Sequence, residues 1–174
     1  MSALAFEQFR SADNMTDAMA ALTWLAQLEC PERDKALQEF YGRWKDEPLV
    51  VDKWLMVQAG SRLSDTLPRV RGLLKHPAFD IKVPNKVHAL IRTFSANHVR
   101  FHAGTGEGYS FLADQIIALN TLNPQVAARM ARGFDRWRKF DTARQAKARA
   151  QLERLRDADG LSKDVAEIVT KALG

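Results

Sequence analysis

Cysteine is almost absent from the 174 residues, because Cys30 is the only one. A single thiol cannot close a disulfide within the chain, and no cysteine pair has the spacing of a zinc site. Cys30 precedes Pro31 at the start of an expected helix, a position that can activate a thiol. No histidine lies near it in the sequence, which favours an unreactive cysteine. The scarcity of cysteine predicts a reducing, cytoplasmic location.

Glycine and proline are also scarce, at nine and six residues. Hardly any stretch shows the strict alternation of a half-buried strand, and no apolar run approaches the roughly 20 residues of a membrane span. The first ten residues lack the basic and then apolar order of a secretory signal. Hydrophobic residues still make up 46% of the chain, which excludes a disordered protein. The composition therefore predicts an all-α globular fold without a membrane-spanning segment.

Apolar residues recur at spacings of three and four along the chain, which predicts roughly eight to ten helices. Side chains suited to cap the N-termini of helices stand at Asn14, Asn85, Asn123, Asp141 and Ser162. The connections are short, and short-linked helices pack as antiparallel pairs, as in an armadillo- or HEAT-like superhelix. No linker rich in proline, glycine or serine divides the chain. Residues 1–174 are therefore expected to form one helical domain.

The positive charge is concentrated in one segment. The chain has a net charge of +5, and residues 129–156 hold ten basic and three acidic residues, so that segment carries +7 and the remainder −2. Such a segment forms either a solvated helix face or a surface for an anionic partner. Alanines, not aromatic residues, alternate with the charges, which favours the solvated face. A stand-alone module that binds nucleic acid or an acidic partner remains the alternative.

Two patterns resemble active-site motifs but lack essential parts of them. His98 and His102 are four residues apart, as two metal ligands on a helix would be, but no glutamate follows His98 as in H-E-x-x-H. Residues 104–108 contain three glycines, as a phosphate-binding loop does, but they lie between helices and include Glu107, which repels phosphate. We therefore expect capping or packing histidines, a helix-connecting turn, and no metal site or catalytic residue in this chain.

Gln125 and Arg129 form the most distinctive polar pair in the sequence. They lie four residues apart at the start of the helix that Asn123 and Pro124 open, so they project from one face. A guanidinium and an amide near a helix N-terminus can hold a carboxylate or a peptide carbonyl. An ordinary exposed face is the competing interpretation.

Several short segments, taken in order, give the sequence a family resemblance. They are Ala12-Asp13-Asn14-Met15-Thr16-Asp17, Asp52-Lys53-Trp54, Pro84-Asn85-Lys86-Val87, Phe101-His102-Ala103, Gly108-Tyr109, Asn123-Pro124-Gln125-Val126-Ala127 and Ile168-Val169-Thr170-Lys171-Ala172-Leu173. Together they resemble the C-terminal helical domain of bacterial aminopeptidase N, a zinc-dependent exopeptidase family. The likeness extends over essentially the whole chain.

The resemblance implies a division of labour between domains. The family's zinc and its H-E-x-x-H helix belong to a separate catalytic domain, and the C-terminal superhelix covers the active-site cavity. The partners implied are the remaining domains of the same polypeptide and peptide substrates, without a membrane or nucleic acid. By resemblance, Gln125 borders the pocket for the first side chain of the substrate and Arg129 binds peptide beyond the scissile bond. His88 stands where the family usually has an arginine, so a second fixed positive charge is missing there.

Overall fold

The computed structural model describes all 174 residues, and every regular element in it is helical. The elements are α1 (Ser2–Ser11), α2 (Met15–Leu25), α3 (Pro31–Trp44), α4 (Pro48–Ala59), α5 (Thr66–Leu73), α6 (Pro84–Val87), η1 (His88–Arg92), α7 (Thr93–Ala96), α8 (His98–Phe101), α9 (Glu107–Leu122), α10 (Pro124–Ala131), η2 (Arg132–Phe134), η3 (Trp137–Lys139), α11 (Thr142–Arg156) and α12 (Lys163–Leu173). The all-α prediction is confirmed. None of the helices is both long and apolar enough to cross a membrane.

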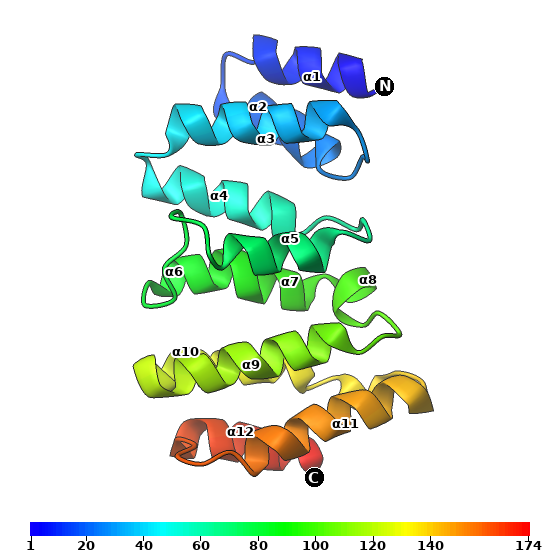
Figure 1. Cartoon of the computed structure of the whole chain (residues 1–174), viewed down its shortest axis with the longest axis vertical. Coiled ribbons are helices and arrows are strands. Elements are labelled where there is room, and N and C mark those ends of the chain that lie inside the picture. Colours follow the sequence, from blue (N-terminus) through cyan, green and yellow to red (C-terminus); the bar gives the residue numbers. More distant parts are fainter.

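The helices stack in chain order along the long axis of the molecule, from α1 at one end to α12 at the other (Figure 1). At the N-terminal end α1 packs on α2 and α3, and in the middle α4 packs on α5 and η1. At the C-terminal end α9 packs on α10 and α11, and α12 closes the stack against the same two helices. Because each helix packs mainly on its neighbours in the chain, the molecule is an elongated superhelix, as the helix rhythm predicts.

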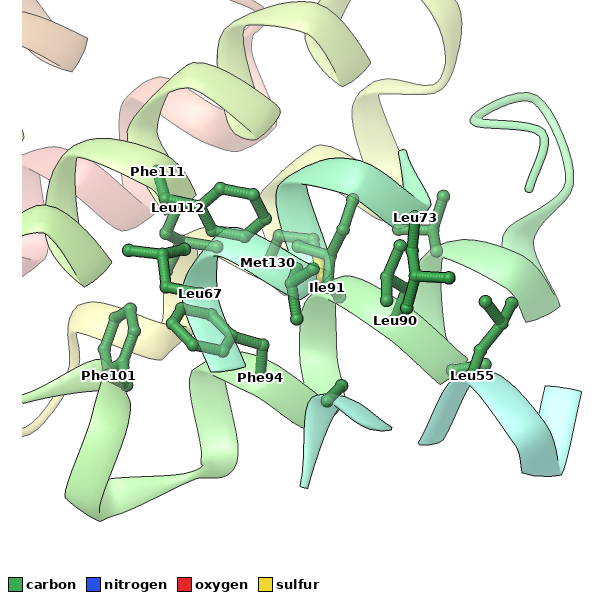
Figure 2. Packing of buried hydrophobic residues seen from close by; sticks show 14 of the residues in the cluster. Leu55, Leu67, Leu73, Leu90, Ile91, Phe94, Phe101, Phe111, Leu112 and Met130 are labelled. Carbon is green, nitrogen blue, oxygen red and sulfur yellow. The ribbon is translucent and has the colours of Figure 1, made fainter. Parts of the chain in front are cut away.

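One hydrophobic core runs through the whole stack. Forty buried residues form a single cluster that extends from Ala5 in α1 to Val169 in α12. Figure 2 shows its middle part, where Phe94 lies between neighbouring helices. The ring centroid of Phe94 is 5.2 Å from that of Phe111 and 6.2 Å from that of Phe101, both in edge-on geometry. Such aromatic pairs add to the stability gained from burial. The core is therefore continuous from the first helix to the last.

Four of the five predicted N-terminal caps are confirmed. The side chains of Asn14, Asn123, Asp141 and Ser162 each accept a hydrogen bond from the backbone N–H three residues later, at 2.9, 3.1, 3.1 and 3.4 Å. The prediction for Asn85 is wrong, because Val83 precedes the helix and Pro84 occupies its first position. Proline already has a helical φ and needs no hydrogen bond there, so the helix starts at Pro84, two residues before the start that an Asn85 cap would give.

The helices outnumber the expected eight to ten, because α1 and the short α8 add to them. Asn97 holds α8 in place. Its side-chain oxygen accepts from the backbone N–H of Arg100, and its amide nitrogen donates to the carbonyl oxygens of Ala59 and Ser61. A single asparagine therefore ties α8 to the end of α4.

Candidate functional site

A basic groove lies where η1, α7, α8 and the end of α10 meet. It has a volume of about 770 Å³, within the range of ligand pockets. We call it the arginine groove, and its lining residues are His88, Arg92, Ser95, Ala96, His98, His102, Arg129, Met130, Arg132, Gly133, Asp135 and Arg136. The structure thus brings together His88 and Arg129, two of the three predicted contact residues, although 40 residues separate them in the chain.

A local departure from α-helical geometry shapes one wall of the groove. The helix that starts at Pro84 widens into the π-turn η1, in which the backbone N–H of Thr93 donates to the carbonyl oxygen of His88, five residues earlier. The hydroxyl of Thr93 donates to the same oxygen at 3.3 Å. Such π-turns often occur at functional sites. Here the turn carries His88 at its first position and Arg92 at its last, and both side chains line the groove.

The opposite wall comes from α10. The amide oxygen of Asn123 and the ring of Pro124 start this helix, and Met130 anchors it in the core with only 1% of its surface exposed. Arg129 is the residue before Met130, and its side chain is exposed on the groove side. After Ala131 the α-helix tightens into the 3-10 turn η2, which carries Arg132 and Phe134.

Gln125 does not line the arginine groove. It lies in a neighbouring hollow of about 480 Å³, together with Asp164 and Glu167 of α12. Arg129 and Arg132 line both hollows, so they form the boundary between them. The two predicted contacts on α10 therefore share a helix face and one hollow, and Arg129 also lines the arginine groove.

The arginines of the groove have no partners within the chain. Arg92, Arg129, Arg132 and Arg136 form none of the salt bridges in the structure and donate no side-chain hydrogen bond. The one carboxylate lining the groove is that of Asp135. Four arginines and one aspartate leave a formal charge of +3 while the histidines are neutral. The groove is therefore positively charged and suited to an anionic group.

The environment of His88 keeps its imidazole uncharged. Burial lowers the pKa of His88 below its usual value, and the charges of Arg92 and Arg129 lower it further. The Nδ1 atom of His88 is buried and has no hydrogen-bond partner. His88 therefore adds a neutral polar group to the groove and not the fixed charge that an arginine would add at the same position.

His102 is held neutral by a different set of contacts. Burial, the neighbouring His98 and Arg144 lower the pKa of His102 to about 4. Its Nδ1 lies 2.9 Å from the hydroxyl of Tyr109, and its ring stacks on Phe140 with centroids 3.7 Å apart. Burial also raises the pKa of Tyr109, so the hydroxyl keeps its proton, and the imidazole tautomer sets the direction of its hydrogen bond with Nδ1. Packing explains His102, as the sequence analysis expected.

The other motif-like patterns also have structural explanations. The rings of His98 and His102 are 5.6 Å apart, and no group of three or more histidine, cysteine, aspartate or glutamate side chains is placed to hold a metal ion. The glycine segment connects α8 to α9. Gly106 has a φ of 78°, which favours glycine, and the carbonyl oxygen of Gly104 accepts a hydrogen bond from Lys147. The loop is a helix-connecting turn that also contacts α11.

Sequence reasoning missed Arg92, Arg132 and Arg136 as members of the site. For Arg92 and Arg132, the sequence spacing could have indicated that they belong to the site. Arg92 follows His88 by four residues, and Arg132 follows Arg129 by three, so each shares a helix face with a predicted contact. Arg136 lies beyond the end of α10, and no helical spacing could have placed it in the groove.

Comparison with known proteins decides the family of the chain. A family model described as a domain of unknown function (DUF3458_C) with ARM repeats matches residues 1–174. The chain belongs to this family. Its members include the C-terminal ARM-repeat domain of bacterial aminopeptidase N, so the resemblance seen in the sequence is confirmed.

Three relatives give the extent of the similarity. The chain is 43% identical to aminopeptidase N of Escherichia coli (strain K12) over 171 residues, and 42% identical to aminopeptidase N of Caulobacter vibrioides over 167 residues. These matches cover 98% and 95% of the chain but 20% and 19% of the relatives. A crystal structure of Legionella pneumophila aminopeptidase A in complex with aspartic acid matches with a TM-score of 0.94 and 38% identity, over 99% of this chain and 20% of that one. The chain thus spans about a fifth of the length of the relatives it matches.

Proposed function

We propose that this chain is the domain of a zinc-dependent aminopeptidase that caps the active-site cavity and contacts the peptide. The parent enzyme releases N-terminal amino acids from peptides in the cytoplasm. The observation that carries the proposal is the arginine groove, because two residues matched to the family's cavity contacts, His88 and Arg129, line one cationic hollow with no partners in the chain. Groups of a bound peptide would supply the partners that the residues of this hollow lack.

The chemistry of bond cleavage belongs to the preceding part of the polypeptide in this proposal. The side chains of this chain do not form a metal site. Zinc, bound elsewhere in the enzyme, would supply an activated water as the nucleophile. The contribution of this domain is to hold the substrate and exclude bulk water, which strengthens polar contacts inside the cavity.

Three residues have separate roles in the proposal. Gln125 borders the pocket for the first side chain of the substrate, with its amide as donor and acceptor. Arg129 binds peptide carbonyls beyond the scissile bond, for which its forked guanidinium is suited. His88, held neutral by burial and by its two arginine neighbours, is a hydrogen-bonding group and not a fixed charge.

Replacement of Arg129 by alanine in the full-length polypeptide tests this function. We expect the ratio of kcat/KM for tetra-alanine to kcat/KM for alanine p-nitroanilide to fall about tenfold, since only the longer substrate reaches Arg129. Arg71→Ala is the matched control, because Arg71 is exposed on α5 and also has no ion pair. An unchanged ratio in Arg129→Ala would contradict contact with the peptide beyond the scissile bond.

The isolated chain gives a second test. We expect the 174-residue protein to cleave neither substrate at any concentration, with or without added zinc. Cleavage that rises in proportion to its concentration and is abolished by a chelator would overturn the assignment of the chemistry to another domain.

A further inference from the structure

We infer that the arginine groove is a receptor for a carboxylate of the peptide, with Arg92, Arg132 and Arg136 as specificity residues that act together with Arg129. This inference rests on the proposed function, because the carboxylate arrives as part of the substrate. It goes further by naming the chemical group that is recognised and three residues that recognise it. The source we favour is the C-terminal α-carboxylate, which every unmodified peptide carries.

The first argument is the absence of internal compensation. The four guanidinium groups line one hollow with a single aspartate and none of them forms an ion pair, while Arg129 and Arg132 also border the adjoining hollow of Asp164 and Glu167. Folding that gathers like charges without partners has an electrostatic cost, which an incoming anion removes. Elsewhere in the same basic segment the protein does supply partners, since Arg149 and Arg154 are paired with Glu153 and Asp114.

The second argument is the placement of the arginines on separate elements. Arg92 comes from the end of η1, Arg132 from η2, and Arg136 from the corner between η2 and η3. They therefore enclose the hollow from more than one side instead of forming a stripe along a single helix. A planar guanidinium binds a carboxylate with two parallel hydrogen bonds, so a few arginines converging on one hollow suit a compact anion. An extended polyanion needs a long basic surface instead.

The third argument is the unpartnered atom within the groove. The buried Nδ1 of His88 has no hydrogen-bond partner in the chain. Buried polar atoms normally have one, so an orphan atom beside a cationic hollow indicates a group supplied from outside. The amide N–H or the carbonyl oxygen of a bound peptide would satisfy this nitrogen, according to which ring nitrogen carries the proton.

The test compares peptides that differ only in their carboxylates. In the full-length polypeptide, kcat/KM is measured for Ala-Ala-Ala, for its C-terminal amide, and for Ala-Ala-Asp amide, in which a side chain carries the only carboxylate. We expect Ala-Ala-Ala to exceed its amide by about tenfold. In the variant Arg92→Gln/Arg132→Gln/Arg136→Gln this preference falls to about twofold or less, as expected when charge-assisted hydrogen bonds are lost. Arg71→Gln, the matched control, keeps the preference.

The three substrates distinguish the sources of the carboxylate. Recovery of the rate by Ala-Ala-Asp amide would assign the groove to an acidic side chain and keep the carboxylate receptor. Equal rates for all three peptides in the unsubstituted enzyme would overturn the inference while leaving the proposed function intact. An enzyme that cleaves none of them, nor alanine p-nitroanilide, would instead overturn the proposed function. A preference unchanged in the triple variant would exclude these three arginines as the receptor.

Direct binding to the 174-residue chain gives a second readout. In NMR spectra we expect Ala-Ala-Ala to shift the ring resonances of His88 more than its amide does at equal concentration, and the triple variant to lose this difference. Equal shifts from the acid and the amide would count against the receptor even if the kinetic preference were present. Inorganic phosphate, added alone, tests whether any small anion suffices. Shifts from phosphate equal to those from the tripeptide would overturn a receptor specific for peptide carboxylates.

Discussion

The two halves of the basic segment differ in how their charges are used. In the groove half, Arg129, Arg132 and Arg136 face a common hollow without partners. In the α11 half, Arg144, Arg149, Arg154 and Arg156 each form an ion pair, with Asp141, Glu153, Asp114 and Asp157 respectively. Arginine thus forms ion pairs that stabilise α11 in one half, and it leaves a positively charged surface without partners in the other.

This difference answers the question that the sequence left open about the positive charge. All four arginines of α11 are paired with neighbouring carboxylates, which weakens the support for a nucleic-acid-binding module. In the groove, by contrast, four arginines without ion pairs line one concave site. Net charge over a segment therefore says little about binding until the partners of each charge are known.

The close approach between Gly108 and Phe101 gives the largest effect on stability that we expect, and it concerns both halves of the basic segment. A Cβ atom at Gly108 would overlap the backbone carbonyl of Phe101, which cannot move without shifting α8 and the groove wall. We expect Gly108→Ala to lower the free energy of unfolding by about 3 kcal/mol, as over-packing does. Chemical denaturation of the chain measures this effect.

Gly42→Ala is the matched control for that prediction. Nothing lies within 4 Å of a Cβ at Gly42, which is in the last turn of α3. We expect this substitution to stabilise the chain by about 0.5–1 kcal/mol, because alanine favours helix over glycine. Similar losses in both variants would show that the close approach at Gly108 has no special role.

His102 links the two halves and should make the stability depend on pH. It lines the groove, and its carbonyl oxygen accepts a hydrogen bond from Arg144 of α11 at 2.6 Å. Its folded pKa of about 4 is below the value of about 6.5 in an unfolded chain, so protons bind the unfolded state more strongly. The free energy of unfolding should therefore fall as the pH falls from about 6.5 to 4, by up to about 1.4 kcal/mol per pH unit. Unfolding curves of the chain measured across this range test the slope.

His102→Gln separates this contribution from the general acid sensitivity of the chain. Glutamine does not titrate, so the slope between pH 6.5 and 4 should become shallower than in the unsubstituted chain. If both proteins show the same slope, another group is responsible and His102 is protonated equally in both states.

The smallest predicted effects contrast one arginine from each half. Arg154→Gln breaks the ion pair with Asp114, in which both side chains are about half exposed, and should cost about 0.5 kcal/mol of stability. Arg132→Gln removes one of several like charges without breaking a pair, so stability should stay unchanged or rise by a few tenths of a kcal/mol. Thermal unfolding at low ionic strength measures both variants. A loss in Arg132→Gln as large as that in Arg154→Gln would refute the contrast.

Local signals in the sequence were sufficient for most of the helices. Asn123 followed by Pro124 predicts the start of α10, and Asp141 that of α11, because a cap depends on only a few neighbouring residues. Asn85 failed as a cap because Pro84 already begins the helix one residue before it. The π-turn at His88 leaves no signal of this kind, since it depends on packing against the rest of the core.

The candidate site was only partly predictable, for a similar reason. Arg149 and Glu153 are four residues apart, so their pairing is visible in the sequence. The pairing of Arg154 with Asp114 spans 40 residues, and the meeting of Arg92 with Arg129 spans 37. Only the folded chain shows that the charge of Arg154 is compensated and that the charges of Arg92 and Arg129 are not.

A crystal structure of the full-length polypeptide with a bound, uncleaved tripeptide tests the central claim most directly. The account predicts that the arginine groove opens onto the cavity that holds the peptide, with a peptide carboxylate oxygen within about 4 Å of at least two of the guanidinium groups of Arg92, Arg129, Arg132 and Arg136. A groove that faces bulk solvent, with the peptide bound elsewhere, would contradict it.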